Sequence, residues 1–197
     1  MNLPNKLSLL RIILIPLMLV AFYIEALPYK FIITAVIFLI AALTDFLDGY
    51  IARKYNLVTD FGKFIDPIAD KILVLSAFVI MLTEPSILSG PFSETFGAII
   101  GGVGVTIIVA REMTVSVLRM IAAEKGIVLA AEKIGKLKTA ITDVAIVFLF
   151  VTANLTGVFG DILYYVSLAL YVISVLLTIY SGIFYLVKNK ELFNQCK

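Results

Sequence analysis

The chain has 197 residues, of which 61% are hydrophobic and only 15% are charged. A mean hydropathy of +1.07 excludes an ordinary soluble domain of this length and indicates an integral membrane protein. Histidine is absent and the single cysteine is Cys196, so zinc, haem and thiolate chemistry have almost no ligands here. The net charge of +2 gives no reason to expect a nucleic-acid partner.

Six apolar stretches are long enough to cross a bilayer as helices, which takes roughly 20 apolar residues each. In chain order we expect spans at 7–24, 31–51, 64–82, 96–121, 139–155 and 162–186. The first could be mistaken for a signal peptide, but no small-residue cleavage site follows it and five more spans do. Strand-like alternation is missing. The expected fold is therefore all-α, a single six-helix transmembrane domain covering residues 1–197.

Basic residues gather on one side of this expected bundle. They stand at the start of the first span, between the second and the third, from the end of the fourth to the fifth, and after the sixth: Lys6, Arg11, Arg53, Lys54, Lys63, Arg119, Lys125, Lys133, Lys136, Lys138, Lys188, Lys190 and Lys197. The connections on the opposite side contain Lys30 as their only basic residue. By the positive-inside rule the basic side, with both termini, is cytoplasmic.

Four aspartates stand at ordered spacing beside two of the most apolar stretches. Asp45 and Asp48 share one face of the second span, and Asp66 and Asp70 share one face of the third. An ionised carboxylate near a bilayer is costly unless it is paired or bound to a cation. Four of them predict a shared divalent metal, and oxygen ligands suit Mg²⁺ or Mn²⁺. The plainer alternative is an acid pair that satisfies Lys or Arg at a helix end.

Other residues of the same region suit a ligand that carries phosphate. Arg53 offers a planar fork of donors to phosphate oxygens. Gly49, Ala52 and Gly62 lack bulk, which would let a nucleotide lie close against the helix backbones. Asp70, the last acid of the series, could reach an incoming hydroxyl and act as a general base.

Together these residues read D-x2-D-G-x2-A-R-x8-G-x3-D-x3-D from Asp45 to Asp70. The pattern resembles the signature of the CDP-alcohol phosphotransferase family, whose members have six spans and a site facing the cytoplasm. The resemblance covers nearly the whole chain and implies that an alcohol displaces CMP from a CDP-linked lipid. It also implies a metal site at Asp45, Asp48, Asp66 and Asp70, a base at Asp70, and CDP-lipid binding at Asn5, Ser8, Gly49, Ala52, Arg53 and Gly62.

Three further segments resemble the branch of this family that uses glycerol 3-phosphate: NLPNKLSLLR at 2–11, REMTVSVLR at 111–119 and GKLKT at 135–139. The resemblance implies CDP-diacylglycerol as the donor, phosphatidylglycerol phosphate as the product, and a bacterial cytoplasmic membrane as the location. Thr142 departs from the branch, which often has Gln at that position.

A phosphorylated acceptor needs cations, and four stand near the cytoplasmic ends of the fourth and fifth spans: Arg111, Arg119, Lys136 and Lys138. Some of them could instead be anchors for lipid headgroups. The same chemistry with another acceptor, namely phosphatidylglycerol, serine or an inositol phosphate, stays open. A cation transporter is a remote alternative. It would place its acids near the midplane of the bilayer, where its helices are broken, whereas these acids cluster towards one face.

Three features allow more than one interpretation. Lys71 could extend to the membrane surface or neutralise the acidic cluster. Asp143 could be a locally satisfied helix acid or a site residue. Glycines at 97, 101, 102 and 104 form a small-residue stripe, which more often packs within a chain but also allows a homodimer.

Overall fold

The computed structural model of the chain describes residues 2–55, 59–124, 127 and 133–190. This part is helical and contains no strand. Its long helices are α1 (Leu3–Tyr23), α2 (Lys30–Lys54), α3 (Asp60–Thr83), α5 (Glu94–Glu124), α6 (Lys133–Thr152) and α7 (Val158–Lys188). Each expected apolar stretch lies within or almost within one of these helices. The one-turn helix α4 (Ser86–Ser89), which follows α3, is not among the expected elements.

Four of the described helices are long and apolar enough to cross a membrane: α1, α2 over Lys30–Ala52, α5 and α7. The chain is therefore a multi-pass membrane protein. Helices α3 and α6 have 24 and 20 residues but do not meet the same criterion. Charged residues interrupt the apolar length of both helices, namely Asp66, Asp70, Lys71, Lys136, Lys138 and Asp143.

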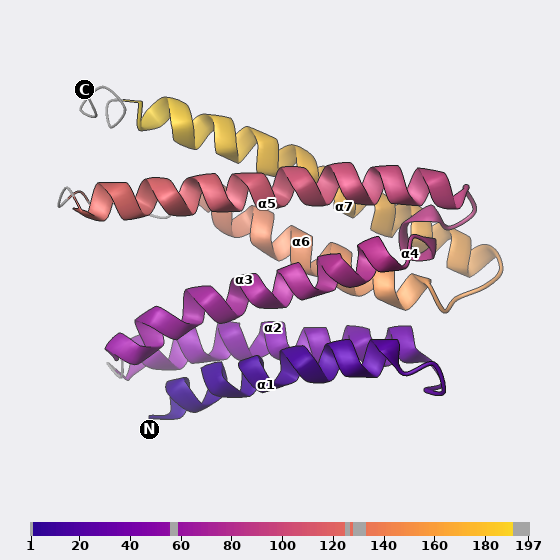
Figure 1. Cartoon of the computed structure of the whole chain (residues 1–197), viewed down its shortest axis with the longest axis horizontal. Coiled ribbons are helices and arrows are strands. Elements are labelled where there is room, and N and C mark those ends of the chain that lie inside the picture. The colour runs from indigo at the N-terminus through magenta and orange to yellow at the C-terminus, as the bar shows by residue number, and fades with distance from the viewer. Residues whose placement is uncertain (1, 56–58, 125–126, 128–132, 191–197) are drawn as a thin grey trace.

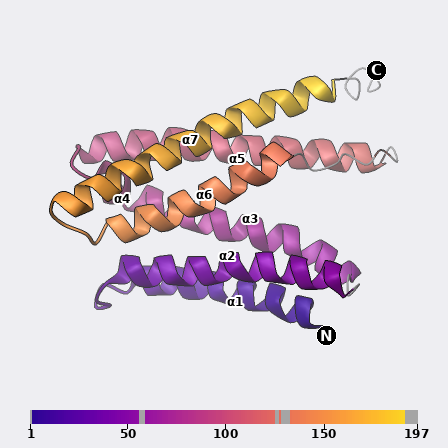
Figure 2. The ribbon, with the colours of Figure 1, turned by 180° about the vertical axis from the view of Figure 1, so that it is seen from behind.

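The long helices run side by side in a bundle, and both ends of the described chain lie at the same end of it (Figure 1). We call this the terminal end. It also holds the last residues of α2 and α5 and the first residues of α3 and α6, as the reverse view confirms (Figure 2). Helix α4 lies at the opposite end. The first turns of α3 and α6, which carry Asp66 and Lys136, thus lie toward the end of the bundle that contains both termini.

The core joins both halves of the chain. Met18 of α1, Phe38 of α2, Phe78 of α3, Phe150 of α6 and Tyr171 of α7 belong to one buried cluster. Many large apolar side chains point outward instead, as expected for helices that face lipid. This shared core therefore fixes the positions of the helices that carry the polar residues of the terminal end.

The glycine stripe of α5 packs within the chain. A Cβ at Gly97 would overlap the backbone next to α4, and one at Gly104 would overlap the ring of Tyr171 on α7. Gly102 faces open space. The glycines thus allow α5 to approach α4 and α7 closely, which is the packing that the sequence favoured.

Candidate functional site

An arginine of α1 lies between the first two aspartates of the motif. The side chain of Arg11 is completely buried; its Nη1 is 2.8 Å from Asp45 Oδ1 and its Nη2 is 2.6 Å from Asp48 Oδ2. The Asp45 side chain is 44% exposed and the Asp48 side chain 3%. Because a buried carboxylate is costly without a partner, Arg11 is the counterion that allows Asp48 to be buried.

A serine of α1 joins the two acidic helices. Ser8 Oγ donates a hydrogen bond to Asp66 Oδ1 on α3 at 2.6 Å and lies 3.4 Å from Asp48 Oδ2 on α2. It is also 3.1 Å from its own helix's Pro4 carbonyl oxygen. A hydroxyl carries one proton, so the short contact to Asp66 is the main bond. Carboxylate oxygens from α2 and α3 therefore converge on one point.

The start of α3 is held by a threonine cap that is itself bound to α1. Thr59 Oγ1 accepts a hydrogen bond from the Gly62 amide at 3.0 Å and donates one to Asn5 Oδ1 at 2.9 Å. A Cβ at Gly62 would lie 3.2 Å from both side-chain oxygens. Glycine at this position thus permits the close approach of α1 to α3, which places Asp66 one turn further along.

Asp70 makes no hydrogen bond or ion pair with this acidic cluster in the described chain, although it is close enough to Asp45 for the two carboxylates to repel each other. In the described chain no three His, Cys, Asp or Glu side chains are arranged to hold a metal. Gly49 and Ala52 are partly buried on α2, and the side chain of Arg53 lies outside the described part. The four-aspartate metal site therefore stays a prediction.

A second polar region adjoins Asp70 between α3, α5, α6 and α7. It is a cavity of about 570 Å³, and we call it the outer cavity. Three of the four predicted acceptor cations line it, namely Arg111, Arg119 and Lys136, together with Asp70 and Lys71.

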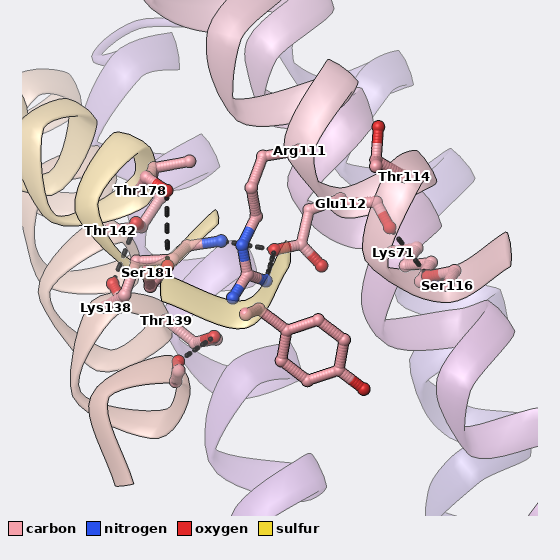
Figure 3. A network of polar contacts seen from close by, with 12 residues as sticks. Lys71, Arg111, Glu112, Thr114, Ser116, Lys138, Thr139, Thr142, Thr178 and Ser181 are labelled. Carbon is pink, nitrogen blue, oxygen red and sulfur yellow. Dashed lines mark hydrogen bonds and ion pairs between the residues drawn. The ribbon is translucent and has the colours of Figure 1, made fainter. Parts of the chain in front are cut away.

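Glu112 organises the cations at the edge of the outer cavity (Figure 3). Its Oε1 accepts from Arg111 Nη1 at 2.9 Å and from Lys138 Nζ at 2.5 Å. The side chain of Lys138 is only 4% exposed, and the residue does not line the outer cavity. Lys71 donates to Ser116 Oγ at 2.6 Å, so its ammonium is directed toward α5. The alternative that Lys71 neutralises the acidic cluster gains no support from this contact.

Two arginines line the outer cavity. The buried Nε of Arg111 has no hydrogen-bond partner among the described residues. The guanidinium of Arg119 lies 5.6 Å from the ring centre of Tyr185, and its Nε donates to the tyrosine hydroxyl at 3.3 Å. An oxyanion in the cavity could accept from both arginines, since guanidinium groups bind phosphate in a bidentate manner.

A model of the CDP-alcohol phosphatidyltransferase family matches residues 1–180 of the chain. The chain belongs to this family. It is 37% identical to the CDP-diacylglycerol–glycerol-3-phosphate 3-phosphatidyltransferase of Bacillus subtilis (strain 168), over 96% of both chains. The enzyme of the same name from Rickettsia felis is 36% identical over 98% of this chain and 97% of its own. A cardiolipin synthase (CMP-forming) from Oryza sativa subsp. japonica is 37% identical over 95% of this chain and 57% of its own.

Arg11 is the residue of this phosphatidyltransferase that sequence reasoning misjudged. The sequence predicts only one of the basic residues at the start of the first span here, whereas Arg11 is buried against Asp45 and Asp48. A signal was present, because Ser8, Arg11, Ile15 and Met18 recur at the spacing of one helix face and all four are buried. An arginine on the apolar face of a helix needs an acidic partner.

Proposed function

We propose that this phosphatidyltransferase transfers the phosphatidyl group of CDP-diacylglycerol to sn-glycerol 3-phosphate, giving phosphatidylglycerol phosphate and CMP. The observation that carries the proposal is the outer cavity, which brings Arg111, Arg119 and Lys136 beside Asp70. A small dianion is the acceptor that such a cation-lined cavity suits. The relatives from Bacillus and Rickettsia, which match this chain over nearly their whole length, carry the name of this reaction.

The acidic motif would hold a divalent cation through Asp45, Asp48, Asp66 and Asp70. The donor set fits Mg²⁺ or Mn²⁺, because all the ligands are carboxylate oxygens and those of Asp48 and Asp66 already converge on the Ser8 hydroxyl. When bound, such a cation supplies Lewis-acid stabilisation of the charge on the pyrophosphate. Arg11 would keep Asp45 and Asp48 in place while the site is empty of metal.

Asp70 would act as the general base. It takes the proton from the acceptor hydroxyl as the hydroxyl oxygen forms a bond to the lipid-side phosphorus. The bond from that phosphorus to the CMP oxygen breaks, and CMP leaves with the electron pair. The position of Asp70 supports this role, since it lines the outer cavity and also lies within electrostatic range of Asp45.

The remaining predicted residues divide between the two substrates. Gly49, Ala52, Arg53 and Gly62 would bind the CDP-lipid, with Asn5 and Ser8 supporting the helices that carry them. Arg111, Arg119 and Lys136 would bind the acceptor phosphate, and their place in the lining of the outer cavity supports this assignment. Lys138 would act indirectly, because its ammonium is bound to Glu112.

We also propose that all six long helices cross a bacterial inner membrane, with the terminal end in the cytoplasm. Helices α3 and α6 are long enough at 1.5 Å per residue, and the terminal end holds the start of α1 and the ends of α2, α5 and α7, the helix ends beside which the sequence places basic residues. The chain would form one catalytic domain. A homodimer stays a prediction, and three of the four glycines of the stripe, Gly97, Gly101 and Gly104, pack within the chain instead.

The relative from Oryza keeps a second acceptor in consideration, because its name denotes cardiolipin synthesis. Release of CMP by purified protein should therefore be followed with CDP-diacylglycerol and each of four acceptors: glycerol 3-phosphate, phosphatidylglycerol, serine and inositol phosphate. We expect turnover with glycerol 3-phosphate alone, and its loss when Mg²⁺ and Mn²⁺ are chelated. Preference for phosphatidylglycerol would replace the proposed acceptor, and full activity after exhaustive chelation would contradict the metal site.

A further inference from the structure

A second, smaller cavity lies next to the outer cavity and deeper in the bundle. It has a volume of about 50 Å³, and we call it the inner cavity. The two cavities share Asp70, Lys71, Glu112 and Thr139 in their linings. Along α6, Gly135 and Lys136 line the outer cavity, whereas Thr142 and Asp143 line the inner one. A ligand bound in the outer cavity could thus extend into the inner cavity past Asp70.

The size of the inner cavity limits what it can hold. One water-sized group needs at least about 10 to 15 Å³ of such space, so the inner cavity admits a few such groups. Much of its wall is apolar, formed by Val74, Leu75, Phe78, Ile108, Val109 and Met113. A hydroxyl-bearing carbon fits this space, whereas a nucleotide does not.

Asp143 is an unused hydrogen-bond acceptor on the wall of this cavity. No hydrogen bond or ion pair to its carboxylate is present within the described chain; its main charged neighbours are Asp70, Asp45 and Lys138. The ammonium of Lys138 is bound to Glu112. The hydroxyls of Thr139 and Thr142 donate to the carbonyls of Gly135 and Lys138 on their own helix, at 3.1 and 2.9 Å.

A carboxylate in such a place is costly without a donor, because two like charges lie near it and the nearby hydroxyls are engaged. A purely structural aspartate would be expected to have a donor within the protein. The missing donor points to a ligand that brings its own hydroxyl group.

We propose that Asp143 recognises the acceptor alcohol by accepting a hydrogen bond from its second, non-reacting hydroxyl. The proposal rests on the proposed function. Glycerol 3-phosphate carries one group for each of the three places: the phosphate for the outer cavity, the reacting hydroxyl for Asp70, which both cavities share, and the second hydroxyl for Asp143 in the inner cavity. Asp143 is thus a specificity residue for polyol phosphates.

The test compares glycerol 3-phosphate with 3-hydroxypropyl phosphate, which lacks only the middle hydroxyl. The quantity measured is the ratio of the two kcat/KM values, from CMP release with CDP-diacylglycerol. For the wild-type protein we expect a preference for glycerol 3-phosphate of roughly 10- to 100-fold, as a charged hydrogen bond provides. Asp143→Ala should lose most of this preference through a lower value for glycerol 3-phosphate, with little change for the analogue.

Asp143→Asn gives a second test that does not depend on the folding of the alanine variant, because Asn has the same shape. Its neutral oxygen accepts a weaker hydrogen bond, so the ratio should fall several-fold. Asp161→Asn is the matched control, since Asp161 is exposed in the first turn of α7 at the other end of the bundle, and it should leave the ratio unchanged. Lys136→Ala should lower both kcat/KM values alike.

The failures of the two proposals differ. A wild-type protein that uses neither phosphorylated alcohol contradicts the proposed function. A wild-type protein that uses both, with a ratio unchanged in Asp143→Asn, overturns the role of Asp143 and leaves the proposed function intact.

Discussion

At the scale of single residues, the buried ion pairs of the terminal end carry the largest consequences. Arg11 is fully buried and contacts two carboxylates, of which Asp48 is buried as well. Removing one partner of such a group leaves the other charge buried without compensation. The stability of the fold should therefore depend on Arg11 more than on any exposed cation of α1.

Arg11→Met should lower the free energy of unfolding by about 3 to 5 kcal/mol, because Asp48 loses its counterion. Thermal unfolding in detergent measures the effect. Lys6→Met is the control, since Lys6 is exposed on the same helix. The double variant Arg11→Met with Asp48→Asn should recover much of the loss. An Arg11→Met protein that melts like the wild type would show that the ion pair contributes nothing.

Asp70→Asn should separate chemistry from binding. Asp45, Asp48 and Asp66 remain to hold the metal, so affinity for CDP-diacylglycerol should change little, whereas turnover should fall by about 10² to 10⁴ as a general base is lost. Ligand binding and CMP release, measured on one preparation, test the two effects separately. Near-normal turnover would show that Asp70 is not the general base. Loss of lipid binding would show that its main role is to hold the metal.

At the scale of elements, close contacts between helices decide how the polar residues meet. Helix α1 approaches α3 where Gly62 has no side chain, and α5 approaches α7 where Gly104 has none. The first contact supports the acidic cluster. The second lies beside Tyr171 in the core, between the two helices α5 and α7 that also line part of the outer cavity.

Gly104→Ala should destabilise the protein by about 1 to 3 kcal/mol, because the added methyl group overlaps the buried ring of Tyr171. Gly102→Ala is a matched control two residues away, where a Cβ meets no atom within 4 Å. That change should be neutral or slightly stabilising, since Ala favours helix more than Gly does. Unfolding of the two variants in detergent compares them directly, and equal melting would contradict the packing of α5 on α7.

At the scale of the whole molecule, the orientation of the bundle links the site to its substrates. Glycerol 3-phosphate is a soluble dianion, so the outer cavity must face the compartment that contains it. Arg119 and Lys136 of the outer cavity stand near the end of α5 and the start of α6, which lie toward the terminal end. Under the positive-inside rule this end is cytoplasmic.

Cysteine labelling tests this orientation in a Cys196→Ser background. A membrane-impermeant thiol reagent should label Tyr55→Cys only in opened or inverted vesicles, and Ser93→Cys in intact cells, because the two exposed positions lie at opposite ends of the bundle. CMP release with glycerol 3-phosphate should be retained in both variants. The reverse labelling pattern would overturn the topology and move the cavity away from its substrate.

The sequence by itself determined the features that depend on neighbours along the chain. Apolar length set the long helices, and helical periodicity placed Asp45 with Asp48 and Asp66 with Asp70 on common faces, because both effects act within a few turns. The signature from Asp45 to Asp70 was sufficient to indicate the family, which the match over residues 1–180 confirmed.

Only the tertiary structure decided which residues from different helices meet. Arg11 contacts Asp48, 37 positions away in the sequence, and is therefore its counterion. Lys138 contacts Glu112, 26 positions away, and does not line the outer cavity. The sequence of α6 does not distinguish whether Asp143 is a locally satisfied helix acid or a site residue. Its surroundings became visible once α3 and α5 closed the inner cavity around it, because the cost of an unpaired carboxylate depends on what every packed helix places beside it.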